Sequence, residues 1–360
     1  MDPTPFVEGI RALAGRTPLF PGDALDVALV LNPRAGGFAH RARYSSALAQ
    51  LKSAQAESAA LPPRSKPVSF RERCTEAPRH ASRLAEEFLD EAALRPASQW
   101  LVILACGDGT SHEYLDALSR APDELRERFT VLRLPMGTGN DGSDGRYMPD
   151  ALARLTGHGR PAIQAALRVR PKPGGPASTK APDGEWRAFN IASVGLDAYV
   201  TVHTNRLKSA MPGDFYKLWL DLASVFYDRF YPPGPMVLSA IDARGKEQSR
   251  HEGRFLLAAM GVSGHRAYGA GKLILPSDHN VCAIRQMGLL RKLALKGPIS
   301  SGRHDRFPEA ELFSADTLVI DYADKLLAQV DGETHELEPA DFPLRMERTK
   351  PLIKYLTRAD

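Results

Sequence analysis

Three short loops combine glycines with polar side chains of the kind that bind and transfer phosphate. They are "NPRAGG" (32–37), "CGDGT" (106–110) and "PMGTGND" (135–141), and each directly follows an apolar run. Glycines let backbone N–H groups approach an anion closely, and a helix that begins after such a loop adds further donors. Asp108 places a carboxylate among these donors, where it could hold Mg²⁺ or accept a proton from an attacking hydroxyl. The alternative reading is that Asp108 or Thr110 only caps the following helix.

The elements that must position these loops are short buried strands separated by helical patterns. Apolar runs typical of buried strands lie at 25–31, 67–70, 100–105 and 129–134. Alternation of strands and helices predicts a doubly wound parallel sheet, whose carboxyl-end loops share one edge and bind ligands there. The sequence contains no GxxxxGK[ST] motif, and the first turn lacks GxGxxG, so the site is neither a P-loop nor an ordinary dinucleotide fold.

The second half of the chain has a different pattern. After the proline- and glycine-rich segment 170–185, apolar runs follow one another without an obvious helix after each, which predicts an antiparallel β domain. The runs are 186–194, 254–262, 281–287, 317–322 and 326–330. Residues 214–231 have helical spacing, and they are read either as a helix packed on this domain or as an apolar lip that contacts lipid.

The length and composition of the chain indicate what type of protein it is. The chain has 360 residues, 43% of them hydrophobic, and a formal net charge of +4 from mixed rather than clustered charges. This length predicts two domains with cores of their own. Three dispersed cysteines argue against a disulfide framework or a zinc site, and no apolar run reaches the ~18 residues of a membrane span. We expect a cytoplasmic protein that does not bind nucleic acid.

The segments "CGDGTSHE" and "LPMGTGND" resemble the catalytic domain of the diacylglycerol kinase family. This family includes bacterial lipid kinases and sphingosine and ceramide kinases, within the NAD kinase and phosphofructokinase grouping. Further stretches resemble it in the same order: "LNPRAGG", "RCTEAPRHASRLAEE", "FNIASVGLDAYV" and "QVDGE". The resemblance covers about residues 25–350, and NAD kinases share the first signature but not the second.

The resemblance implies a two-domain fold with a cleft between the domains. On this basis residues 1–24 are an N-terminal extension and 25–163 form a Rossmann-like nucleotide-binding α/β domain. Residues 164–340 form a β-sandwich substrate domain, and 341–360 return to the first domain.

The resemblance also implies which residues act. Asp108 and Glu333 are the two candidate proton acceptors, and Asp108 would also bind the Mg²⁺ that accompanies ATP. Asp197 either orients the acceptor or makes a structural hydrogen bond, and Asp278 stands where a structural Mg²⁺ is bound in bacterial members. The residues expected to bind ATP are Asn32, Pro33, Arg34, Ala35, Gly36, Thr75, Gly107, Gly109, Thr110, Glu113, Gly137, Thr138 and Asn140.

Four departures from the family pattern qualify these expectations. Cys106 replaces a glycine or serine, and His112, which either caps a helix or touches nucleotide, replaces an amide side chain. The segment "GNDGSDG" lacks the usual phenylalanine and alanine. His279 and Asn280 beside Asp278 do not match, which puts that metal site in doubt.

The function that these features predict is ATP-dependent transfer of a phosphoryl group to the hydroxyl of a diacylglycerol-like lipid. A soluble polyol, sugar or nucleotide acceptor is one alternative, and a non-catalytic nucleotide-binding regulator is another. The partners expected are a nucleotide, a hydroxyl acceptor and, for a lipid, peripheral contact with the inner membrane face. Both a monomer and a homodimer are left open.

Overall fold

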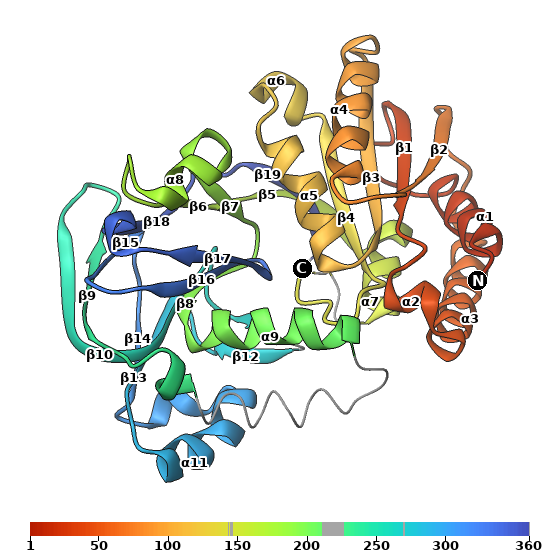
Figure 1. The fold of residues 1–360 in the computed structure, drawn as a ribbon. Coiled ribbons are helices and arrows are strands. Elements are labelled where there is room, and N and C mark those ends of the chain that lie inside the picture. Colours follow the sequence, from red (N-terminus) through yellow and green to blue (C-terminus); the bar gives the residue numbers. More distant parts are fainter. Residues whose placement is uncertain (143, 145–146, 211–226, 269–270, 360) are drawn as a thin grey trace. The chain divides into compact units, whose positions relative to one another are not determined.

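The computed structural model describes residues 1–142, 144, 147–210, 227–268 and 271–359 (Figure 1). The chain divides into two compact units. Unit 1 comprises residues 1–164 and 351–360, and unit 2 comprises residues 165–350. Each unit has its own sheet and its own apolar core.

Unit 1 is built on a six-stranded sheet of order β2-β1-β3-β4-β19-β5. Every neighbouring pair is parallel except β19 and β5, which run antiparallel at one edge. The expected parallel sheet is therefore confirmed. Its strands are β1 (Ala24–Leu31), β2 (Val68–Cys74), β3 (Ser98–Cys106), β4 (Phe129–Pro135), β5 (Gly159–Gln164) and β19 (Ile353–Arg358).

Helices cover both faces of this sheet (Figure 1). Alternate residues of β1 point to opposite faces, so Val27 and Leu29 join the core beneath α1, α3 and α7. On the other face, which carries α4 and α5, Trp100 of β3 stacks on Phe129 and contacts Phe88 of α4. The helices are α1 (Thr4–Ala14), α2 (Gly36–Ala39), α3 (Arg41–Ser58), α4 (His80–Ala93), α5 (Asp108–Ser119), α6 (Asp123–Arg126) and α7 (Met148–Ala153), followed by the π-helical turn η1 (Arg154–His158).

The first 24 residues are an integral part of unit 1, which differs from the expected extension. Helix α1 buries Phe6, Ile10 and Leu13 in the same core as β1. These residues recur at i, i+4 and i+7, and the prolines nearby stand at the start of the helix, where proline is tolerated. The sequence contains this helical spacing, but the helix is short, and prolines near its start are more typical of a loop.

Unit 2 contains one curled antiparallel sheet of eleven strands. The long strand β10 pairs through its first half with β9 and through its second half with β8 and β13. It therefore connects the strands on the β9 side of the sheet with those on the β8 side. The strands of the sheet are β6 (Leu167–Arg170), β7 (Trp186–Ala188), β8 (Ile191–Gly195), β9 (Pro235–Ile241), β10 (Glu247–Gly261), β13 (Val281–Arg285), β14 (Ala310–Phe313), β15 (Thr317–Tyr322), β16 (Leu326–Val330), β17 (Glu333–Leu337) and β18 (Leu344–Arg348). The antiparallel domain predicted from the sequence is confirmed.

Several shorter elements complete unit 2. A separate two-stranded sheet pairs β11 with β12, and short helical turns connect the longer strands. These elements are β11 (Arg266–Tyr268), β12 (Lys272–Leu275), α8 (Pro176–Lys180), η2 (Pro182–Gly184), η3 (His304–Arg306) and η4 (Pro339–Asp341).

Unit 2 also contains helices that the sequence pattern did not reveal. They are α9 (Leu196–Ala210) and α11 (Leu289–Ser300). The predicted strand 186–194 is two strands, and the Asp331 carboxylate accepts the amides of Phe189 and Asn190 between them and of Ile191 at the start of β8. Of the predicted helix 214–231, residues 214–226 lie outside the described residues.

The C-terminal return is shorter than expected. Strand β18 ends at Arg348 and pairs with β15 and β6 inside unit 2. Of the expected segment, residues 351–360 alone belong to unit 1, where β19 inserts between β4 and β5. Among the helices that the structure describes, none has the length and apolar character needed to cross a bilayer.

Burial of β19 gives a first prediction. Leu356 is fully buried in the unit 1 core, so Leu356→Ala should lower the free energy of unfolding by about 2–5 kcal/mol through lost burial and the cavity left behind. Leu94→Ala is the control, because Leu94 is 84% exposed and should change stability little. Chemical denaturation followed by circular dichroism measures both, and an equal effect of the two substitutions would contradict the placement of β19.

Candidate active site

The three glycine-bearing loops meet at the carboxyl edge of the unit 1 sheet. Asn32, which follows β1, donates from Nδ2 to Thr110 Oγ1 at 2.8 Å, and this joins the first loop to the second. The Gly37 amide donates to Met136 O at 2.8 Å and joins the first loop to the third. The loops therefore form one continuous surface of backbone and small polar groups.

Two glycines allow the second and third loops to touch. A Cβ on Gly137 would stand 2.9 Å from Gly107 Cα, which is closer than real Cβ contacts allow, and the obstructing atom belongs to the backbone. Gly36 is similarly confined, since its Cβ would lie 3.0 Å from Thr138 Oγ1. Glycine is thus required here for close approach of the chain to itself.

Helix α5 presents its N-terminus to this surface. Gly107 is the N-cap residue, and no side chain caps the helix, so the first amides of α5 are available to an anion. Asp108 directs its Oδ1 to the Gly142 amide at 3.1 Å, and Thr110 Oγ1 accepts from Asn32. Neither residue is the cap that the alternative reading required.

A buried ion pair holds the third loop against β4. Arg133 donates from Nη2 to Asp144 Oδ1 at 2.8 Å, and its backbone amide donates to Asp144 Oδ2 at 2.7 Å. The guanidinium also lies over the Tyr355 ring of β19, with Cζ 4.4 Å from the centroid. Within the loop, Asn140 adopts a left-handed conformation (φ 57°) and accepts the Gly137 amide at 2.6 Å. Asp144 thus ties the chain after this loop to β4.

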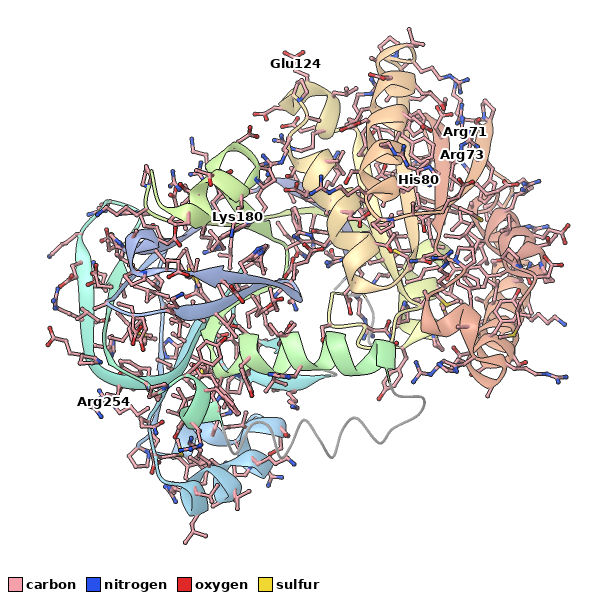
Figure 2. All side chains as sticks on the ribbon, viewed as in Figure 1. Arg71, Arg73, His80, Glu124, Lys180 and Arg254 are labelled. Carbon is pink, nitrogen blue, oxygen red and sulfur yellow. The ribbon has the colours of Figure 1, made fainter. Side chains whose placement is uncertain are left out.

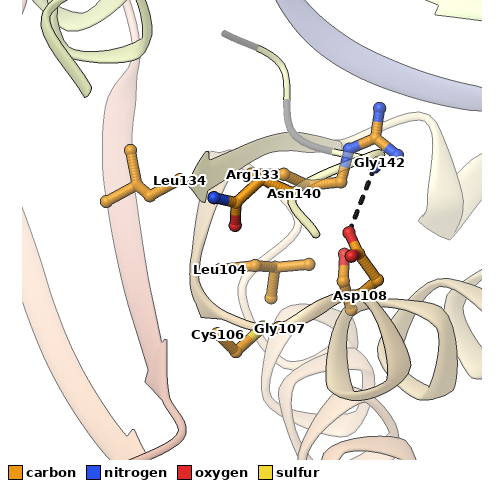
Figure 3. A pocket seen from close by; sticks show the side chains of 9 residues that line it. Leu104, Cys106, Gly107, Asp108, Arg133, Leu134, Asn140 and Gly142 are labelled. Atoms are coloured by element: carbon orange, nitrogen blue, oxygen red, sulfur yellow. Dashed lines mark hydrogen bonds between the residues drawn. The ribbon is translucent and has the colours of Figure 1, made fainter. Parts of the chain in front are cut away.

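A small pocket opens beside Asp108 (Figure 3). One of its walls carries the buried hydroxyl of Ser111, which has no hydrogen-bond partner among the described residues. A buried donor without a partner costs free energy, so this hydroxyl is suited to bind a ligand or a water molecule. The pocket is lined by Leu104, Cys106, Gly107, Asp108, Ser111, Arg133, Leu134, Asn140 and Gly142.

Cys106 forms part of this pocket without the properties of a nucleophile. It is the last residue of β3 and is buried. Burial, with a smaller contribution from the Asp108 charge, raises the pKa of its thiol well above the usual range. The thiol therefore stays protonated at neutral pH. Gly107, the next residue, still approaches Gly137 closely.

The other residues predicted to bind nucleotide lie on the same edge or next to it. Thr75 follows β2, and its amide bonds to Leu31 O at 2.8 Å, beside the start of the first loop. Arg34 is exposed, whereas His112 and Glu113 are half-buried on α5. Pro33 and Ala35 occupy the turn between β1 and α2.

Basic side chains missed by sequence reasoning surround this edge. A Cβ on Gly36 would lie 3.2 Å from Arg43 Nη1, so this guanidinium of α3 reaches the first loop. Arg73 near the end of β2 and His80 at the start of α4 lie on neighbouring elements (Figure 2). Arg43 lies outside the glycine-bearing motifs, so only the folded chain reveals its proximity.

Asp197, at the start of α9 in unit 2, belongs to a hydrogen-bonded network. Its Oδ2 accepts from Ser193 Oγ at 2.7 Å and from Gln329 Nε2 at 3.4 Å. Gln329 in turn donates to Ser193 Oγ at 3.0 Å. The network gives Asp197 a structural role, and a role toward the acceptor stays a prediction.

The "QVDGE" segment forms the β16–β17 hairpin. Asp331 and Gly332 make its two-residue turn with positive φ values of 48° and 94°, as Asp-Gly hairpin turns require. The Asp331 carboxylate is occupied by three backbone amides, whereas Glu333 is exposed at the start of β17. Asp331 is therefore committed to the turn, and the role of Glu333 as a proton acceptor stays a prediction.

The segment around Asp278 supports the fold. Asp278 is fully exposed and pairs with exposed His265 at 3.0 Å. Asn280 is buried and exchanges two hydrogen bonds with the Ala315 backbone, at 2.9 and 3.0 Å. Across the described residues no group of three or more His, Cys, Asp or Glu side chains could hold a metal ion. The structure gives the predicted metal site at Asp278 no support.

Residues 26–158 match the family model of the diacylglycerol kinase catalytic domain, and this range contains all three loops. The matched range lies within unit 1. A search of curated proteins finds no significant match to the sequence.

Solved structures show the same fold over both units. The chain is similar to a diacylglycerol kinase from Bacillus anthracis strain Sterne at 15% identity, with a TM-score of 0.56 and coverage of 92% of this chain and 97% of that chain. A provisionally named diacylglycerol kinase from the same strain gives 17% identity and a TM-score of 0.60 with the same coverages. The family is one of kinases, so the chain is assigned to the phosphotransferases and to the use of ATP.

Contact between the second and third loops yields a second prediction. Gly137→Ala should destabilise unit 1 by about 1–3 kcal/mol, because the added methyl group meets the Gly107 backbone. Gly109→Ala is the matched control, since its Cβ would meet nothing within 4 Å. Thermal unfolding of both variants measures the difference, and equal stability would contradict the close approach of the two loops.

Proposed function

We propose that the protein is an ATP-dependent kinase that transfers the γ-phosphoryl group to a hydroxyl of a diacylglycerol-like lipid. The observation that carries this proposal is the single surface that three loops of unit 1 form around Asp108. It combines an uncapped helix N-terminus, which binds phosphate, with a carboxylate, which binds a metal ion or a proton.

In this proposal the nucleotide phosphates lie along the loops rather than in a P-loop. The amides of residues 107–110 and of Thr138 and Gly139 donate to the phosphate oxygens, and Asn32 and Thr110 hold the first two loops together. Thr75 and residues 32–36 contact the rest of the nucleotide. Arg43 adds a positive charge beside Gly36, where it favours an anionic ligand.

Magnesium fits the donors at Asp108. A Cβ on Gly139 would lie 3.1 Å from both Asp108 Oδ2 and Asp141 Oδ2, so two carboxylates face this point. Mg²⁺ is commonly held by one or two carboxylates together with substrate phosphates and water, which agrees with this set. When bound, the ion would neutralise charge on the transferring phosphoryl group.

The remaining chemistry is proton transfer and alignment. The acceptor hydroxyl attacks phosphorus, its proton passes to a carboxylate, and ADP leaves. Asp108, in unit 1, and Glu333, in unit 2, are the two proposed acceptors of that proton. Because an alcohol is a weak acid, the carboxylate takes the proton late, as the bond to phosphorus forms.

A lipid acceptor is favoured by the names of the similar structures, which are diacylglycerol kinases. It implies a cytoplasmic protein in peripheral contact with the inner membrane face, as a monomer or a homodimer. A soluble polyol, sugar or nucleotide is the alternative acceptor, since the fold does not determine it. A non-catalytic regulator is less favoured, because Asp108 keeps a free carboxylate edge toward Gly139.

The role of Asp108 gives a third prediction. Asp108→Asn should lower kcat for ATP-dependent phosphorylation by roughly 10²–10⁴-fold, because an amide can accept no proton and binds Mg²⁺ poorly. Asp116→Asn, on the same helix and in a half-buried pair with Arg120, is the control and should keep normal turnover.

Glu333→Gln separates the two candidate bases. If Glu333 is the base, this variant loses turnover and the acidic limb of the pH–rate profile while Asp108→Asn mainly weakens Mg·ATP binding. A near-normal kcat together with an unchanged KM for Mg·ATP in Asp108→Asn would exclude both roles assigned to that residue.

The acceptor class gives a fourth prediction. Purified protein with Mg·ATP should release ADP only when diacylglycerol or a related lipid is added. The screen covers phosphatidylglycerol, sphingoid bases and soluble polyols in parallel. Turnover with a soluble polyol alone would establish the alternative acceptor, and nucleotide binding without turnover on any compound would favour the regulator.

A further inference from the structure

Helix α11 of unit 2 exposes leucines in a way that no other described helix does. Leu289, Leu290 and Leu293 are 49%, 84% and 52% exposed. Among the described residues, the other strongly exposed large hydrophobic side chains are scattered singly at Met1, Leu94, Tyr147, Ile163 and Phe230. Single exposed hydrophobics are normal on proteins, whereas a cluster marks a surface that contacts something apolar.

The three leucines share one face of α11. At 3.6 residues per turn they span roughly 100° of the helix circumference. Leu295 lies on the opposite side and is buried, and Ile299 packs against the unit 2 core. The helix therefore has two apolar faces, one turned to the domain and one turned to solvent.

Ion pairs hold α11 in this orientation. Lys292 Nζ pairs with Asp228 Oδ2 at 2.5 Å, and Arg291 Nε pairs with Glu309 Oε1 at 2.6 Å. Both acids belong to neighbouring segments, so they tie the first turn of the helix to the domain. Because the helix is anchored on both flanks, the leucines cannot turn inward without breaking these pairs.

The charge around the leucines is positive. Residues 289–300 contain three basic side chains and no acidic one, and two of the three, Arg291 and Lys292, pair with Glu309 and Asp228 from neighbouring segments. Lys296 is exposed in the second half of the helix, and Arg303 and Arg306 are exposed just after its end. Asp305, between these two arginines, is the one exposed acidic residue of this stretch. This charge complements an anionic surface.

We propose that α11 is a membrane-docking helix that lies in the headgroup region of an anionic bilayer, with Leu289, Leu290 and Leu293 inserted. Twelve residues span about 18 Å, which is too short to cross a bilayer but sufficient to lie in its interface. The role of this docking rests on the proposed function, because it would hold a lipid kinase at the surface that contains its acceptor.

The experiment measures binding of the full chain to vesicles without ATP. Wild-type protein should float with phosphatidylcholine vesicles that contain phosphatidylglycerol, and less with phosphatidylcholine alone. Leu290→Asp should reduce the bound fraction roughly tenfold or more, since a charge replaces an inserted leucine. Leu94→Asp is the matched control, because Leu94 is equally exposed, at 84%, in unit 1, and it should bind as wild type does.

Two further measurements test the charge contribution and the insertion of α11 separately. Lys296→Gln should weaken binding to the anionic vesicles only, and its effect should shrink as salt is raised to about 0.5 M. Leu290→Trp should show a blue-shifted emission on vesicles, and Leu94→Trp should not. Equal binding of Leu290→Asp and wild type would overturn the proposal.

The outcome is separable from that of the proposed function. Kinase activity of the same variants is measured with a dispersed short-chain acceptor in the absence of vesicles. Vesicle binding without turnover would count against the kinase alone, and turnover without binding against the docking helix alone. Concentration-dependent dimers that Leu290→Asp disperses, without vesicle binding, would show that the face binds a second copy and overturn the membrane assignment.

Discussion

The site in unit 1 depends on one close contact, the approach of Gly107 to Gly137. A single added methyl group on Gly137 would place carbon 2.9 Å from the neighbouring backbone. The contact brings the N-terminus of α5 against the loop that follows β4, and the Asn32 and Gly37 hydrogen bonds add the loop after β1. The loops that follow three strands therefore form one surface only because these backbones can touch.

Around that contact, charge is arranged so that Asp108 keeps part of its carboxylate available. Its Oδ1 accepts the Gly142 amide, and its Oδ2 faces the space beside Gly139. Arg133 pairs with Asp144, and this pair ties the chain after the third loop to β4.

The residues proposed to take part in the reaction are distributed over both units. Unit 1 contains the phosphate donors and Asp108, whereas Glu333, Asp197 and helix α11 belong to unit 2. In unit 2 the acids near the "QVDGE" hairpin are mostly committed, since Asp331 accepts three amides and Asp197 accepts from Ser193. A kinase for a membrane lipid would need a surface that reaches the acceptor, and the leucines of α11 supply a candidate in the same unit.

The sequence by itself determined the parallel sheet of unit 1, the antiparallel sheet of unit 2 and the three loops, because buried strands and glycine turns are encoded by neighbouring residues. It did not reveal that β19 enters the first sheet or that α1 packs beneath it, since both depend on partners far along the chain. Only the tertiary structure paired Arg133 with Asp144, brought Arg43 to Gly36 and exposed one side of α11. Which polar groups meet, and which apolar ones do not, is decided by packing rather than by local pattern.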